Sequence, residues 1–343
     1  MKKTTIRDVA EEAGVSYVTV SNVINNKGRM AERTKKKVLS VIKKTGFYPD
    51  ITAATLSKGS SDAVAFVSSY LSSPFVFSVL SGMEKKLYET GKFSHSIEHY
   101  ATRGADELKT DVIRNLLYGK RAGAVVMLTV KMEAGLMREF IKRKVPVVMV
   151  ESLFKGAHSV RVDNFRGAYD AASYLVKTGR KKILLVNGAV KPLDFDRDVS
   201  PAAVERLQGF KEALKSNGLE FRDSNAVYVD FYNQEEGSRI MGEMLKSRQK
   251  YDAVFCAAGD MVAAGMIKRA KNEGVKIPSD IAIIGYDDID FGRVEEPLLT
   301  TVRQPAAKMG EAAFETAVLA MEGKLKKTAD IVLMPELIIR KTA

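Results

Sequence analysis

The chain has 343 residues, of which 45% are hydrophobic and 28% charged, and its net charge is +12. This composition excludes a disordered chain, and the length leaves room for roughly two or three domains. The single cysteine, Cys256, excludes an internal disulfide framework and any metal site built from several cysteines. The N-terminal residues MKKTTIRDVA carry charge without an apolar run behind them. We therefore expect no signal peptide, no membrane association and a cytoplasmic location.

The basic surplus is concentrated near the N-terminus. Residues 1–59 contain 12 Lys and Arg against 5 Asp and Glu, whereas the other 284 residues contain 42 against 37. Such a segment favours a polyanionic partner, because each phosphate contact releases counterions. The lysines at 35–37, taken alone, are equally typical of a solvated helix face. The pattern of the residues around them distinguishes this interpretation from binding of a polyanion.

Three short helices are predicted in this basic segment. Thr5 and Asp8 form a capping box at the start of the first helix, which Gly14 ends. Ser16 caps a second helix, and a third is expected over Glu32–Thr45. The apolar stripes expected to form the core are Ile6, Val9, Ala10 and Ala13, then Val20, Val23 and Ile24, then Val38, Leu39 and Ile42. Two helices joined by a tight Gly-containing turn form a helix-turn-helix.

The second helix carries the chemistry for reading DNA, because its N-terminal residues enter the major groove in this motif. The exposed side is predicted to present Tyr17, Val18, Ser21 and Asn22. Asn bonds both N6 and N7 of adenine, and Val packs on a thymine methyl group. Thr19 and Asn25 suit phosphate contacts. A three-helix bundle that binds protein is the alternative, which the basic surplus disfavours.

The runs TIRDVAEEAGVSYVTVSNVINNKG and TKKKVLSVIKKTGFYPDITAATL resemble the DNA-binding headpiece of the LacI (lactose-repressor) family. The resemblance implies a headpiece over residues 1–48 and, over 49–60, a hinge that folds only on DNA. Leu56 takes the place of a minor-groove wedge, the alternative being an ordinary linker residue. The implied DNA contacts are Thr5, Ser16, Tyr17, Val18, Thr19, Ser21, Asn22, Asn25, Arg29 and Leu56. The family usually has Arg at Asn22, which predicts a different operator, and Ser or Thr at Ala31, whose absence removes a helix cap.

From Ala63 onward, short apolar runs alternate with helical stretches. The predicted strands are 63–69, 94–100, 124–128, 147–150, 183–187, 253–257 and 281–286, and helices include 82–89, 204–216, 261–273 and 309–321. This alternation predicts an α/β fold with βαβ units and mostly parallel sheets. The length suits two such sheets, with a ligand between them at the carboxyl ends of the strands.

Segments such as VRVDNFRGAYDAASYLVKTG and KIPSDIAIIGYDD resemble the regulatory core of the same family, which is shared with periplasmic sugar-binding proteins. The resemblance implies an effector-binding and dimerisation core over 61–343. Its N-subdomain covers about 61–162 and 305–330, and its C-subdomain covers about 163–304 and 331–343. The implied effector contacts are Phe75, Glu151, Arg206, Phe231, Tyr232, Asp260, Asp287 and Gln304. Gly259 replaces a usual Asn, and the 188–206 loop is longer than usual, so the effector's identity is left open.

Enzyme functions find no support in the motifs. His95 to His99 match the H-x-x-E-H zinc spacing, but the segment alternates like a strand, which holds the two histidines too far apart for one metal ion. We expect no cofactor and no metal, and a packed Cys256. The expected protein is a DNA-binding transcriptional regulator that acts as a homodimer on a palindromic operator and is controlled by a small molecule, most simply a carbohydrate. The alternative is a sugar-binding module whose headpiece binds DNA architecturally. The sequence leaves the operator, the target genes and the direction of control open.

Overall fold

The computed structural model describes residues 4–24, 30–47, 61–90, 95–103, 105–130, 132–190, 200–290 and 296–343. The chain divides into two units, an N-terminal one ending at Asp62 and a larger one that begins at Ala63 and runs, apart from a short loop, to Ala343. The predicted hinge with Leu56, and the predicted DNA contacts Asn25 and Arg29, lie outside the described residues.

The N-terminal unit contains three helices, α1 (Ile6–Ala13), α2 (Tyr17–Ile24) and α3 (Glu32–Thr45). The capping box is confirmed: the Asp8 amide donates to Thr5 Oγ1, and the Thr5 amide donates to Asp8 Oδ2. Gly14 ends α1 with a φ of 63°, a left-handed conformation that glycine adopts without steric cost. The core that joins the helices consists mainly of Val9, Ala13, Val20, Val23, Val38, Val41 and Phe47.

The inner face of α3 differs from the prediction at one position. Leu39 is 47% exposed, whereas Val41 is buried beside Val38, and Ile42 packs against them. Residues at i, i+3 and i+4 share one side of a helix, and Leu39 is turned about 100° away from Val38. Ala31 stands at the N-cap of α3 without a side-chain hydrogen bond, as its lack of a hydroxyl predicts.

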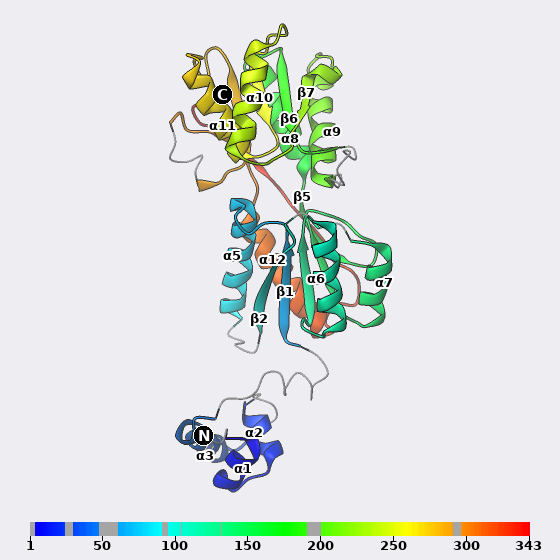
Figure 1. The fold of residues 1–343 in the computed structure, drawn as a ribbon, viewed down its shortest axis with the longest axis vertical. Coiled ribbons are helices and arrows are strands. Elements are labelled where there is room, and N and C mark those ends of the chain that lie inside the picture. Colours follow the sequence, from blue (N-terminus) through cyan, green and yellow to red (C-terminus); the bar gives the residue numbers. More distant parts are fainter. Residues whose placement is uncertain are drawn as a thin grey trace. The chain divides into compact units, whose positions relative to one another are not determined.

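The larger unit contains two sheets of mostly parallel strands, which confirms the predicted α/β class (Figure 1). Sheet A has the strand order β11-β5-β4-β3-β1-β2. Its strands are β1 (Ala63–Ser68), β2 (Ser96–Ala101), β3 (Ala124–Leu128), β4 (Val147–Val150), β5 (His158–Val162) and β11 (Asp330–Leu333). Helices α5 (Pro74–Glu89) and α12 (Ala306–Met321) pack on one face, and α6 (Asp106–Tyr118) and α7 (Ala134–Lys142) cover the other.

Sheet B repeats this plan with the order β12-β10-β9-β8-β6-β7, in which only β10 and β12 run antiparallel. Its strands are β6 (Ile183–Asn187), β7 (Ala226–Tyr228), β8 (Ala253–Cys256), β9 (Ala282–Asp287), β10 (Thr300–Arg303) and β12 (Glu336–Ile338). Helices α10 (Gln234–Lys246) and α11 (Asp260–Asn272) cover one face, and α8 (Asn164–Lys177) and α9 (Pro201–Ser216) cover the other; a 3-10 turn, η1 (Asp223–Asn225), precedes β7.

Both sheets have buried strands whose alternate residues serve two cores. In β1, Val64 and Phe66 join one hydrophobic cluster, while Ala65 and Val67 join the cluster on the opposite face. The chain passes between the two halves after β5, after β10 and after β11. β11 stays in sheet A as far as Leu333 and β12 begins in sheet B at Glu336, so the third passage lies between these two residues. Among the described helices, none is both long enough and apolar enough to span a lipid bilayer.

The contact between α5 and α12 depends on glycine. A Cβ built on Gly310 would overlap the Val79 carbonyl oxygen, whereas a Cβ on Gly135 in α7 would meet open space. Gly310→Ala is expected to lower the free energy of unfolding by about 1–3 kcal/mol through overpacking. The control Gly135→Ala is expected to raise it by up to about 1 kcal/mol, because Ala favours a helix. Urea unfolding of both variants measures the difference, and equal effects would contradict this packing.

Candidate functional site

The N-terminal end of α2 is the exposed part of the helix-turn-helix. Ser16 caps the helix, since its Oγ accepts a hydrogen bond from the Thr19 amide at 3.1 Å and lies 2.9 Å from Thr19 Oγ1. Tyr17 is 61% exposed and Val18 48%, while Val20 and Val23 on the opposite side are buried in the core. This end of the helix therefore presents an unusually apolar, aromatic surface for a segment that is otherwise rich in lysine.

Three other predicted DNA contacts lie on α2 and at the start of α1. Ser21 and Asn22 are half-buried on α2, and Asn22 lies one turn beyond Val18 on the same side of the helix. Thr5 is exposed at the start of α1, with its hydroxyl donating to Asp8 at 2.8 Å. The structure thus brings Ser16 to Asn22 together on one helix and its cap.

In the larger unit, a chain of hydrogen bonds joins the end of sheet A to sheet B. Glu151, which follows β4, is buried, and its two carboxylate oxygens accept from the Val162 amide at 2.8 Å and from Asn164 Nδ2 at 2.9 Å. Asn164 Oδ1 in turn accepts from Arg206 Nε at 2.8 Å. Burial raises the pKa of Glu151, while Arg206 and these two donors lower it.

Arg206 is held on three sides. Its Nη1 donates to the Ala257 carbonyl at 2.7 Å, and its guanidinium lies 3.7 Å from the centre of the Tyr286 ring. The Tyr286 hydroxyl donates to Asn164 Oδ1 at 3.1 Å. Asn164 and Tyr286 are not among the predicted site residues, although both lie in segments that resemble the family's core and Tyr286 ends a predicted strand. The structure makes Asn164 the shared partner of Glu151, Arg206 and Tyr286.

Asp287 and Gln304 meet where β9 and β10 end. Gln304 Nε2 donates to Asp287 Oδ1 at 2.6 Å, and Gln304 is buried while Asp287 is half-buried. Burial raises the pKa of Asp287 to about 6, against smaller opposing effects of Arg206 and the Gln304 hydrogen bond. Asp287 has a φ of 112°, an unusual backbone conformation for a residue with a side chain.

The neighbouring carboxylates have structural partners. Asp260 is fully buried, with Oδ1 accepting from Thr301 Oγ1 at 2.7 Å and Oδ2 from the Ile289 amide at 3.0 Å. Asp288 is buried between Arg303 and Arg340, with its carboxylate 2.7 Å and 2.6 Å from their nitrogens. Asp260, itself a predicted effector contact, therefore has both carboxylate oxygens bonded within the protein, whereas Asp287 Oδ2 accepts no hydrogen bond from a described residue.

The predicted aromatic contacts lie in different surroundings. Phe231 and Tyr232, which follow β7, are each 59% exposed. Gly188 lies directly beneath the Tyr232 hydroxyl, so that a Cβ there would overlap it. Phe75, near the start of α5, packs partly on the core of sheet A. Among the described residues, no hydrogen bond or ring contact joins Phe75 to Arg206 or Asp287.

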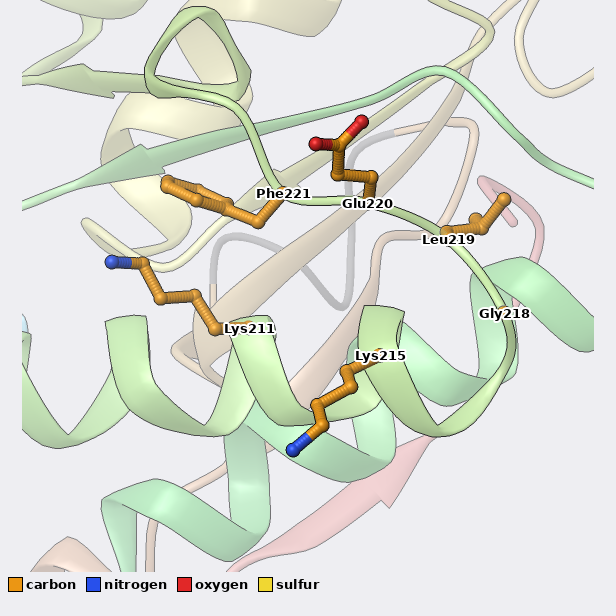
Figure 2. Close-up of a pocket in the computed structure, with 6 residues that line it drawn as sticks. All are labelled: Lys211, Lys215, Gly218, Leu219, Glu220 and Phe221. Carbon is orange, nitrogen blue, oxygen red and sulfur yellow. The ribbon is translucent and has the colours of Figure 1, made fainter.

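A separate shallow cavity of about 490 Å³ lies at the end of α9. Figure 2 shows its lining residues: Lys211, Lys215, Gly218, Leu219, Glu220 and Phe221. The Lys211 ammonium lies 4.4 Å from the centre of the Phe221 ring. The cavity includes none of the predicted effector residues.

His99 and Cys256, considered above for metal binding and as a reactive thiol, both lie in surroundings that are typical of structural residues. His99 lies in strand β2, as the alternating pattern predicts, with Nε2 2.9 Å from Ser68 Oγ. Cys256 is fully buried, which confirms a packed thiol, and burial raises its pKa. A thiol with a raised pKa is a poor nucleophile near neutral pH.

A helix-turn-helix unit joined to a two-sheet α/β unit, with polar groups at its strand ends, defines a class of DNA-binding regulator. The family described as "Bacterial regulatory proteins, lacI family" matches residues 5–50, and the "Periplasmic binding protein-like domain" matches residues 172–343. The HTH-type transcriptional regulator DegA of Bacillus subtilis (strain 168) is 32% identical over 98% of this chain and 97% of its own. The chain belongs to the LacI family of transcriptional regulators, which are not enzymes.

Solved structures agree with this assignment. The complex of the transcriptional regulator CelR with cellobiose has a TM-score of 0.72 and 28% identity, covering 99% of this chain and all of that one. The lac repressor dimer bound to operator and the anti-inducer ONPF has a TM-score of 0.83 at 23% identity, covering 99% of both chains. The first supports a common family, and the second a common fold.

Because the pKa of Asp287 is raised, replacing this residue with a neutral one is expected to raise the free energy of unfolding by an amount that depends on pH. The folded chain holds this proton more tightly than the unfolded chain, so ionisation costs stability as the pH rises from 3.8 through about 6. Asp287→Asn avoids that cost and still accepts from Gln304. We expect it to be neutral at pH 4 and to add about 1–2 kcal/mol above pH 7. Urea unfolding across this range measures it, and a gain that does not depend on pH would contradict the assignment.

Proposed function

We propose that this chain is a transcriptional repressor that binds a palindromic operator as a homodimer and releases or engages it in response to a small molecule. Two α2 helices would occupy successive major grooves of one duplex, with Leu56 of each protomer between them in the minor groove. Two similar proteins support this proposal: the transcriptional regulator DegA, and the lac repressor, whose dimer was solved bound to operator.

The capped, exposed start of α2 is the observation that best supports the proposed binding of DNA. Ser16 holds the first turn, which leaves the side chains of Tyr17 and Val18 directed outward from the core. Apolar and aromatic side chains at this point suit thymine methyl groups and sugars, and Asn22 one turn later suits adenine. The lysines of α3 add sequence-independent attraction to phosphate.

We further propose that the effector binds where Glu151, Arg206, Asp287 and Gln304 lie. The hydrogen bonds from Glu151 to Asn164 and on to Arg206 join the ends of sheets A and B. A ligand that bonds to these groups would bind one relative arrangement of the sheets better than another, and so shift the population of DNA-binding forms. The CelR complex with cellobiose supports a sugar or sugar derivative as the effector.

Selection of random duplex DNA by the full-length protein, followed by sequencing, tests this function. At near-physiological salt we expect a palindrome with adenine in each half-site. Binding without enrichment, lost steeply as salt increases, would instead support the architectural alternative, in which the headpiece reads no sequence. Repeating the selection with added small-molecule extract separates that outcome from the need for a corepressor.

A further inference from the structure

The effector edge of sheet B is the set of residues at the carboxyl ends of β6, β8, β9 and β10: Asn187, Gly259, Asp287 and Gln304. These four neighbouring strands are parallel, so their carboxyl ends lie along one edge of the sheet. Some polar atoms along this edge already have a hydrogen-bond partner within the described residues, and others have none. Those without a partner are all hydrogen-bond acceptors.

Two amide oxygens on the effector edge lack a donor within the part of the chain that the structure describes. Asn187 is fully buried, and its Nδ2 donates to the Ala203 carbonyl, but its Oδ1 has no hydrogen bond. Gln304 is 5% exposed, and its Nε2 donates to Asp287, but its Oε1 has none. Buried acceptors without a partner are uncommon, and each calls for a hydrogen-bond donor.

The third open acceptor is the carboxylate of Asp287. Its Oδ1 accepts from Gln304, and neither oxygen has an ion pair with a described residue. A Cβ on Gly259 would lie 3.0 Å from Asp287 Oδ2 and 3.9 Å from the Tyr286 carbonyl oxygen, with nothing else near but Asp287 Cγ. The glycine, at a position where relatives are expected to carry an Asn side chain, therefore leaves room beside Asp287 Oδ2 that a larger residue would fill.

The nearest cation is largely committed elsewhere. Arg206 donates to Asn164 Oδ1 and to the Ala257 carbonyl, and stacks on Tyr286. Its charge is also balanced by the buried carboxylate of Glu151, whose pKa it lowers. The effector edge consequently offers open amide oxygens and one carboxylate that has no ion pair among the described residues and is influenced by Arg206 only at longer range.

We infer that the effector is an amine-bearing polyol, such as a hexosamine, whose protonated amine lies above Gly259 and pairs with Asp287. An ammonium group carries three donors, one of which suits Asp287 Oδ2. A neighbouring hydroxyl donates to Gln304 Oε1. A phosphate or carboxylate in the same place would meet acceptors and like charge. This inference rests on the proposed effector function and specifies its ligand.

Thermal unfolding of the full-length protein with three metabolite pools tests the inference. The cationic pool contains hexosamines and aminocyclitols, the neutral pool hexoses, pentoses, disaccharides and polyols, and the anionic pool sugar phosphates and uronic acids. We expect the cationic pool alone to raise the unfolding midpoint, because a ligand that binds the folded state stabilises it. A rise with the neutral or anionic pool alone would overturn the inference and leave effector control intact. A lack of response to every pool would contradict effector control itself.

Two variants locate the response. Asp287→Asn is expected to weaken binding of the active amine about 10–100-fold, the value of a charge-assisted hydrogen bond. Its own unfolding midpoint shows that it folds. The control Asp223→Asn, at an exposed position in η1, is expected to bind as the wild type does. Equal affinity of the wild type and Asp287→Asn for the amine would also overturn the inference.

Discussion

Replacing Arg206 with Met is expected to lower the free energy of unfolding of the larger unit by about 2–4 kcal/mol. The substitution leaves the Asn164 Oδ1 and Ala257 carbonyl acceptors without their guanidinium donors and removes the stack on Tyr286. It also leaves Glu151 buried without the charge that lowers its pKa. Urea unfolding at pH 7.5 measures the loss.

A matched variant and a double variant separate this network from general loss of charge. Arg166 in α8 pairs with Asp170 at 2.8 Å on the surface, and Arg166→Met is expected to cost about 0.5 kcal/mol or less. Glu151→Gln in the Arg206→Met background is expected to recover part of the stability, because it removes the uncompensated charge. Similar losses for Arg166→Met and Arg206→Met, or no recovery in the double variant, would contradict the network.

Asn22→Ala is expected to abolish the preference for one base pair in each half-site, a loss of about 1–3 kcal/mol in discrimination. Asn22 is half-buried on the same side of α2 as Val18, and its amide makes no hydrogen bond to another described residue. Affinity for duplexes of unrelated sequence is expected to stay nearly unchanged, since phosphate contacts supply that term.

Competition binding with operator duplexes that differ at single positions measures this effect. Substituting a residue that contacts a base removes the preference at one position of the duplex. Substituting a residue that only positions the helix weakens binding to all duplexes alike. Uniform weakening by Asn22→Ala would therefore show that another side chain reads that base.

The secondary structure of both units follows from local signals in the sequence. Strands β3, β4 and β6 and helix α3 begin and end at the predicted residues, because apolar runs, caps and glycines mark them. Helix α5 begins at Pro74, earlier than the predicted Gly82, and Pro at the first helical position is a start signal that the apolar pattern alone does not reveal. Leu39 is apolar but exposed, because its angular position on α3, about 100° from Val38, directs it away from the core.

The binding network was less predictable, because it depends on how separate segments meet. Arg206 and Glu151, both predicted as effector contacts, are joined through a residue that was not predicted: Asn164, 42 residues before Arg206, lies between them. Asp260 and Asp287 carry the same chemical group, yet Asp260 accepts hydrogen bonds from Thr301 and Ile289 through both oxygens, while Asp287 accepts through only one oxygen within the described part of the chain. Only tertiary contacts distinguish these two roles.

The most direct test of the central claim is the ratio of affinities for the selected palindrome and for a scrambled duplex of the same length. Full-length protein is titrated against both at near-physiological salt, with and without the active metabolite pool. A sequence-specific repressor under effector control is expected to prefer the palindrome by about 1,000-fold or more in one of the two conditions and to lose most of that preference in the other. Equal affinity for both duplexes in both conditions would contradict the claim.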